Sequence, residues 1–128
     1  MTSVVLDASA VLAFVKGETG GEAVLPYVGD AAISAVNLQE VVKELLRDGL
    51  EVEIVREIVD GLRLAVHDHD AAAAYAAAGL HAQTERYGRG LGDRTCMALG
   101  LSLGLPVLTA DREWRRVEVE GLALEHIR

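Results

Sequence analysis

Short apolar runs of strand type alternate with helix-patterned segments along almost the whole chain, and this alternation restricts the folds that the chain can adopt. Strands are expected at 3–6, 31–34, 64–67, 105–109 and, at the edge of the sheet, 122–127; helices are expected at 8–17, 20–28, 35–48, 52–62, 71–88 and 94–103. The order predicts an α/β fold with helices on both faces of a mostly parallel central sheet, which gives three layers. No linker or repeat interrupts it, so we expect one domain over residues 1–128.

The segment 35–48 has the most regular helical pattern in the chain. Its apolar residues are predicted to form one stripe that packs against the sheet. The stripe consists of Leu38, Val41, Val42, Leu45 and Leu46. Glu40 then falls on the polar face, where an ordinary solvated glutamate is expected.

The charge of the chain argues against nucleic acid as a partner, because phosphate binding normally depends on basic surface. Lys and Arg number 12 against 20 Asp and Glu, for a net charge of -8. Residues 86–116 are different, with a local excess of Arg. The Arg residues of this stretch are Arg86, Arg89, Arg94, Arg112, Arg115 and Arg116. The stretch is equally well interpreted as a solvated helix face and as a rim that guides phosphates.

The single cysteine and the apolar segments bear on where the protein works. Cys96 has no partner for an internal disulfide, and its apolar neighbours predict a buried, inert thiol. The N-terminus lacks a basic leader, and no apolar run reaches membrane-spanning length without polar or Pro breaks. We therefore expect a protein of the reducing cytoplasm without a membrane partner.

Four acidic residues are predicted to meet at the carboxyl edge of the sheet, where ligands of open parallel sheets bind. Asp7 ends the first strand, and Asp111 lies two residues beyond the strand 105–109. Glu40 sits one to two turns into the helix after the second strand, and Asp93 opens a helix whose start faces the same edge.

Carboxylates gathered in this way repel one another unless a cation compensates them. Mg²⁺ prefers oxygen ligands and is held by a few carboxylates together with substrate phosphate. Such a metal can activate a water for attack on a phosphodiester. Taken singly, however, Asp7, Asp93 and Asp111 are each better explained as helix N-caps than as metal ligands. The pattern alone therefore predicts a candidate cluster and no more.

Two pairs of residues, one of histidines and one of arginines, are further candidates for binding. His67 and His69 form an H-x-H pair that can bind a transition metal, but no Cys or third His is near, so a surface or capping role is expected. Asp70 is expected to cap the following helix. Arg94 and Arg112 neighbour the proposed metal ligands, so they can contact substrate phosphate or pair with the acids themselves. Trp114 is expected to pack in the core.

Four segments of the sequence are similar to the motifs of one known family. They are VVLDASAVLAFVKGE, ISAVNLQEVV, GLGDRTCMALGLSLGLPVLTADREW and LEHIR. In order and spacing they resemble the PIN domain, specifically the VapC-type toxins of bacterial toxin-antitoxin pairs. The resemblance spans nearly the whole chain, although residues 51–87 match only in pattern.

The resemblance implies a role for each motif residue. Asp7 matches the acid of the first strand, Glu40 that of the NLxE segment, Asp93 that of the DR segment and Asp111 that of the TxD segment. It implies that Asp7 and Asp93 contact the metal most directly, with Glu40 and Asp111 completing the site partly through water. Further matches are Thr109, a hydroxyl residue that supports the cluster, and Ser9 in the DxS position.

The function implied by the resemblance is an Mg²⁺- or Mn²⁺-dependent endoribonuclease that limits translation, forms a homodimer and is silenced by a VapB-like antitoxin. A catalytically silent PIN-like binding module is the alternative, and the intact acids disfavour it. A receiver-like or phosphohydrolase domain also places an Asp after its first strand. It would require a late Lys or a second Asp at position 9, whereas position 9 is Ser and no Lys follows Lys43.

Overall fold

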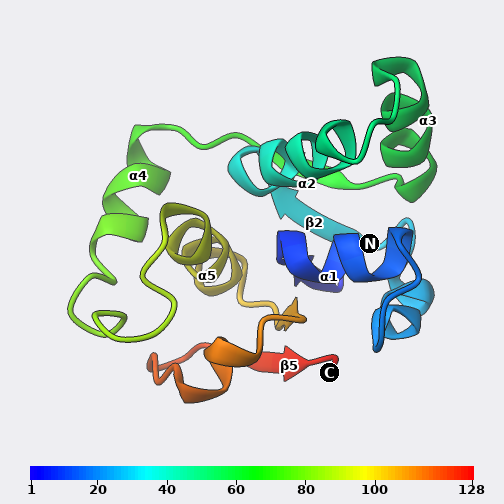
Figure 1. Cartoon of the computed structure of the whole chain (residues 1–128). Helices are drawn as coiled ribbons and strands as arrows, with labels where there is room; N and C mark the ends of the chain where they lie inside the picture. The colour runs from blue at the N-terminus through cyan, green and yellow to red at the C-terminus, as the bar shows by residue number, and fades with distance from the viewer.

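The computed structural model describes all 128 residues and contains one five-stranded sheet in which every pair of neighbouring strands is parallel (Figure 1). The elements are β1 (Val4–Leu6), α1 (Ala8–Val15), the 3₁₀ helix η1 (Gly21–Tyr27), β2 (Ala31–Ser34), α2 (Ala35–Arg47), α3 (Val52–Leu62), β3 (Ala65–His67), α4 (Ala71–Ala78), α5 (Leu91–Leu103), β4 (Val107–Thr109), the 3₁₀ helix η2 (Arg112–Arg116) and β5 (Leu124–His126). The predicted α/β architecture is confirmed. None of the helices combines the length and the apolar composition needed to cross a bilayer.

The strands β1, β2 and β4 are buried on both faces, because helices cover the side chains that point to either side. Val4, Leu6 and Ile33 pack in one core with side chains of α1, α2 and α3. Val5 and Val107 pack in the other, with side chains of α4 and α5. Figure 1 shows the two groups of helices on either side of the strands. Trp114 and Cys96 are fully buried in the second core, as expected from the sequence.

The strand order β3-β2-β1-β4-β5 places β1 in the centre. The chain proceeds outward from β1 to β3 and then returns to the other side of β1 to form β4. The connection that follows β1 leads toward β2, and the one that follows β4 leads toward β5, in the opposite direction. The loops after β1 and β4 therefore diverge at the carboxyl edge of the sheet, which leaves a crevice between them. Gly100 lets α5 lie close to β4, since a Cβ there would come 2.4 Å from Cγ2 of Val107. Residues that follow β1 and β4 are thus brought together.

Three of the predicted helices differ from the structure. The long helix expected over 71–88 ends as α4 at Ala78, and turns follow in which Leu80 and Thr84 are buried and Nε of Arg94 donates to Oγ1 of Thr84 (2.7 Å). Alanine propensity is a weak preference that such tertiary contacts override. The helix expected from 94 begins at Leu91. The segment 20–28 is 3₁₀ rather than α-helical.

The buried stripe of α2 also differs from the prediction. The side chains that α2 buries are Asn37, Val41 and Leu45, whereas Leu46 is 42% exposed. The helix is rotated so that a polar residue faces the interior, where Asn37 contacts the start of α5. Glu40 is consequently half-buried and does not lie on a fully solvated face.

Candidate active site

Asp7 is placed by the end of β1 at the switch point of the sheet and is only 5% exposed. It occupies the N-cap position of α1, yet its side chain makes no capping hydrogen bond. Its Oδ2 instead accepts hydrogen bonds from Oγ of Ser9 (2.5 Å) and Oγ1 of Thr109 (3.0 Å). The cap interpretation is therefore wrong for Asp7, whose carboxylate joins the ends of β1 and β4.

Burial raises the pKa of Asp7 from 3.8 to about 6. The hydrogen bonds from Ser9 and Thr109 favour the ionised form and oppose this shift, while the charges of Asp93 and Glu40 add to it. Ionised Asp7 is therefore costly in this environment, and a nearby cation would relieve the cost.

Two hydroxyl groups connect Asp7 to the strand-end segment that contains Asp111. Oγ of Ser9 accepts a hydrogen bond from the Ala110 amide (2.9 Å), and Oγ1 of Thr109 accepts one from the Asp111 amide (3.1 Å). The carboxylate of Asp111 itself accepts from the Glu113 amide (2.9 Å) and so caps η2. The predicted capping role is therefore confirmed for Asp111, which also lies at the edge of the site.

Glu40 is held against the start of α5 by Asn37. Nδ2 of Asn37 donates to Oε1 of Glu40 (2.8 Å) and to the carbonyl oxygen of Gly92 (3.0 Å). The absent side chain of Gly92 leaves room for this carboxylate, since a Cβ there would lie 2.4 Å from Oε1 of Glu40. Sequence analysis did not find Asn37. Its spacing of three residues from Glu40, which puts both on one helix face, was the available signal.

Asp93 is the third residue of α5 rather than its first, with Gly90 as the N-cap. Its Oδ2 accepts a hydrogen bond from the Gly90 amide (3.2 Å). Burial raises the pKa of Asp93, and the charge of Asp111 adds to this effect, whereas the Gly90 amide lowers it. The indole N–H of Trp114 is buried and forms no hydrogen bond.

The four acids thus converge from segments far apart in the sequence, and none of them forms an ion pair with Lys or Arg. As the side chains stand, no three His, Cys, Asp or Glu residues are grouped closely enough to hold a metal ion. Mg²⁺, however, needs only one or two protein carboxylates and keeps several waters. An all-carboxylate set with a buried, uncompensated Asp7 fits a hard divalent cation of this kind.

The two arginines predicted to neighbour the site have different environments. Nε of Arg94 donates to Oγ1 of Thr84 (2.7 Å), so this side chain secures the turns before α5. Arg112 is exposed in η2, directly after Asp111, and forms no hydrogen bond or ion pair. Of the two arginines, therefore, only Arg112 has a side chain beside the acids that is free to bind a ligand.

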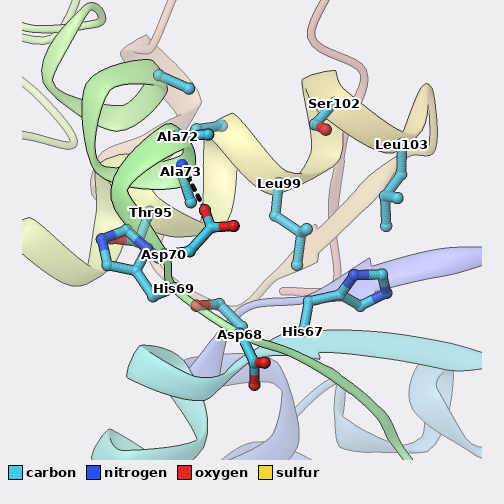
Figure 2. Close-up of a pocket in the computed structure, with 13 residues that line it drawn as sticks. His67, Asp68, His69, Asp70, Ala72, Ala73, Thr95, Leu99, Ser102 and Leu103 are labelled. Carbon is cyan, nitrogen blue, oxygen red and sulfur yellow. Dashed lines mark hydrogen bonds between the residues drawn. The ribbon is translucent and has the colours of Figure 1, made fainter.

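The His67–Asp70 segment lies elsewhere and lines a cavity of about 300 Å³ between the end of β3, α4 and α5 (Figure 2). The carboxylate of Asp70 accepts a hydrogen bond from the Ala73 amide (2.9 Å), which confirms its predicted capping role. Thr95 lines this cavity, and it is two residues from Asp93, so it projects from the opposite side of α5. The helix α5 therefore separates the cavity from the acids.

Comparison with known proteins agrees with the fold and with the order of the motifs. The PIN domain family model matches residues 4–120. A chain of the DNA-bound VapBC structure from Salmonella typhimurium is similar to this one over 100% of both chains, with a TM-score of 0.73 and 25% identity.

Two further solved structures share the fold at lower identity. VapBC2 from Rickettsia felis, bound to a DNA fragment from its promoter, is similar over 98% of each chain, with a TM-score of 0.71 and 20% identity. A toxin-antitoxin complex from Klebsiella pneumoniae is similar over 98% of each chain, with a TM-score of 0.75 and 15% identity. No curated protein sequence matches this chain. With a family match that spans nearly all of its length and a parallel sheet that gathers the four motif acids, this chain belongs to the PIN domain family.

Proposed function

We propose that this chain is a metal-dependent endoribonuclease and the toxin of a toxin-antitoxin pair. The observation that carries the proposal is the cluster of Asp7, Glu40, Asp93 and Asp111 at the switch point, where no basic side chain forms an ion pair with the acids. Desolvated carboxylates of this kind are typical of functional sites. Membership of the PIN domain family supports a nuclease as the function.

Asp7 and Asp93 are the residues that we expect to hold Mg²⁺ or Mn²⁺, with Glu40 and Asp111 contributing partly through water. When bound, such an ion lowers the pKa of a water and stabilises the charge that develops on a phosphodiester. Ser9 and Thr109 both bond to Oδ2 of Asp7, which leaves Oδ1 without a protein donor. We infer that they orient this carboxylate so that Oδ1 faces the metal.

RNA is the proposed substrate, in spite of the net charge of -8. A metal bound by the acids would attract a phosphodiester, and exposed Arg112 lies at the edge of the same site. The resemblance of the motifs to those of VapC-type toxins supports RNA over DNA.

Cleavage of a labelled single-stranded RNA, and of DNA with the same sequence, tests this proposal. We expect the RNA alone to be cut with Mg²⁺ or Mn²⁺, and EDTA to stop the reaction. Asp93→Asn is the essential variant, because a contaminating nuclease would be unaffected by it. The matched control is Glu44→Gln, which removes a carboxylate one turn beyond Glu40 that pairs with Lys43 and Arg47. Cleavage that survives Asp93→Asn would contradict the proposal, and metal binding without cleavage would favour the silent module.

A VapB-like antitoxin is the proposed partner, and its docking surface is an apolar groove along α2. The groove is lined by Ala35, Leu38, Gln39, Val42, Lys43, Leu46 and Arg47. Leu38, Val42 and Leu46 follow one another at four-residue spacing, which suits the apolar face of a partner helix. The titles of the similar structures name VapBC and toxin-antitoxin complexes, which supports such a partner. Leu46→Glu should prevent capture of an antitoxin encoded beside this protein while RNA cleavage is retained.

We further propose that the chain forms a homodimer in the cytoplasm. Three large apolar side chains are exposed. They are Val66 in β3, Tyr75 in α4 and Leu91 at the start of α5, and their exposed fractions are 45%, 83% and 84%. Exposed apolar area of this kind is typical of interaction surfaces. Light scattering after size-exclusion chromatography should give twice the chain mass, and Tyr75→Glu with Leu91→Glu should give a monomer.

A further inference from the structure

An open hollow of about 610 Å³ adjoins the acids on the side of β4 and β5. It is lined by Ser9, Thr19, Ala110, Asp111, Arg112 and Arg128. Ser9 bonds to Asp7, and Asp111 is one of the four acids, so the hollow is continuous with the candidate active site. Its two basic residues, Arg112 and Arg128, stand directly beside an otherwise acidic centre.

Arg128 is held in place by contacts with three separate segments. Its Nε donates to the carbonyl oxygen of Ala110 (3.0 Å), and its Nη1 lies 3.6 Å from Oε1 of Glu18. Its own carbonyl oxygen accepts a hydrogen bond from Nη2 of Arg115 (2.5 Å). Nη2 of Arg128 has no partner in the protein. The guanidinium is therefore held through Nε and Nη1, and Nη2 has hydrogen-bonding capacity left.

The opposite wall of the hollow comes from the turn after α1. Gly20, with φ +85°, packs so tightly against the end of β5 that a Cβ there would lie 1.9 Å from the carbonyl oxygen of Ile127. Only glycine allows this approach in this backbone conformation. The contact brings Glu18 and Thr19 beside Arg128. The hollow is thus built by close packing of two distant segments and not by chance proximity of surface side chains.

The chemistry of the hollow suits a phosphodiester. A guanidinium presents a planar fork of N–H donors that matches phosphate oxygens. Arg128 is bonded to Ala110, the residue between Thr109 and Asp111, so an anion bound by its Nη2 lies next to the acids. The acids alone would repel a polyanionic strand. The charges of Arg112 and Arg128 offset those of Asp111 and Glu18 on this side of the site.

We propose that Arg128, together with Arg112, forms a subsite that binds the phosphodiester next to the one being cleaved. The inference rests on the proposed nuclease function and adds to it a defined path for the RNA strand, which leaves the acids over the ends of β4 and β5. Arg128 is a substrate-binding residue in this scheme and takes no part in the chemical step.

Binding of a fluorescent single-stranded RNA, measured by anisotropy over a range of salt concentrations in an Asp93→Asn background with Mg²⁺, tests the subsite. Arg128→Gln should weaken binding about tenfold at low salt and reduce the slope of log affinity against log salt by about 0.7. Arg128→Lys should recover the slope but not the full affinity, because it keeps the charge and loses the fork. Arg56→Gln, on exposed α3, is the matched control and should behave as the parent.

Arg112→Gln is the second variant, because this exposed side chain has no protein contact whose loss would affect folding. It should reduce affinity and slope as Arg128→Gln does. In the cleavage assay with intact Asp93, both variants should raise KM and leave kcat nearly unchanged. Unchanged affinity, slope and KM in both variants would overturn the subsite even if the wild type cleaves RNA. If Arg112→Gln and Arg128→Gln lose capture of the antitoxin but bind RNA as the parent does, the RNA subsite is overturned as well.

The two proposals fail in different ways. RNA binding that depends on Arg128 in a protein that cuts no RNA would overturn the nuclease and support the subsite. Cleavage that depends on Asp93 but not on Arg128 or Arg112 would do the reverse.

Discussion

The acidic site and the histidine-lined cavity both lie where strands of the same sheet end, and they differ in how they are built. The acids come from four segments that meet between β1 and β4, in the centre of the sheet. The residues His67 to Asp70 are consecutive and follow β3, an edge strand. Although its residue types suit a metal, the carboxylate of Asp70 in the consecutive segment caps α4. Convergence at the centre of the sheet, rather than a run of consecutive residues, buries Asp7 near other carboxylates and raises its pKa.

Burial is the physical difference between the two regions. Asp7 is 5% exposed, and burial is the largest cause of its raised pKa. Asp68 and Asp70 are exposed at the sheet edge, where water solvates their charges. A buried acid has a stronger need for a cation than an exposed one.

The largest effect should come from removing an acid of the central site. Asp7→Asn and Asp93→Asn should each lower metal-dependent RNA cleavage by at least about 100-fold, because each removes a proposed metal ligand. The matched double variant His67→Ala/His69→Ala should cleave at the wild-type rate. Initial rates of RNA cleavage at saturating Mg²⁺ measure these effects. An equal loss of cleavage in the acid variants and in the histidine variant would contradict the distinction between the two regions.

The raised pKa of Asp7 predicts a pH dependence of both activity and stability. Cleavage at subsaturating Mg²⁺ should fall as pH decreases through about 6, since the metal must then displace a proton from Asp7 in order to bind. For stability the sign is reversed. The folded-state pKa lies above the unfolded value of 3.8, so protonation stabilises the metal-free fold at low pH, and this contribution is lost as pH rises through about 6.

The corresponding cost at pH 7 is about 3 kcal/mol for the metal-free protein. Asp7→Asn should therefore raise the melting temperature of the metal-free protein at pH 7 and abolish the further rise that Mg²⁺ produces in the wild type. Differential scanning calorimetry with and without EDTA distinguishes these effects. A variant that melts lower than the wild type in EDTA would show that burial of the charge is not costly.

A smaller effect is expected from the residues that orient Glu40. Gly92→Ala places a Cβ where the Glu40 carboxylate lies, and this flexible side chain can move aside without unfolding the protein. We expect cleavage to fall about tenfold, as is typical when a supporting contact of a metal ligand is lost, with an unchanged melting temperature. Glu40→Gln should lose at least as much activity, and Glu44→Gln should lose none. Full activity of Gly92→Ala would mean that the position of Glu40 is unimportant.

The smallest effects belong to the histidine-lined cavity. Asp70→Ala should reduce the free energy of unfolding by about 1 kcal/mol through loss of the α4 cap, with cleavage unaffected. His67→Ala/His69→Ala should change it by less than about 0.5 kcal/mol. Denaturation in urea, with and without Zn²⁺, measures both. Stabilisation by Zn²⁺ that depends on the histidines would contradict the interpretation of this region.

The alternation of strands and helices could be predicted from the sequence because it depends on neighbours within a few residues. Periodicity predicted β1, β2 and β4, and the carboxyl edge of a parallel sheet then placed Asp7, Glu40, Asp93 and Asp111 together. The family resemblance added the interpretation of this cluster as a metal site and ranked Asp7 and Asp93 as its most direct ligands. Local pattern failed where a tertiary contact prevailed, as at Thr84, where the predicted long helix gives way to turns.

What only the tertiary structure decided is how the acids are supported and which partners they have. Ser9 and Thr109 are 100 residues apart, and Asn37 and Gly92 are 55 apart, yet each pair lies in contact at the site. Periodicity cannot predict such contacts, because they depend on the rotation of α2 and on the approach of α5. The sequence by itself determined which carboxylates reach the edge of the sheet. Packing decided that Asp7 is buried, that Glu40 is held against α5 and that Arg128 faces the hollow beside them, because burial and orientation exist only once distant segments meet.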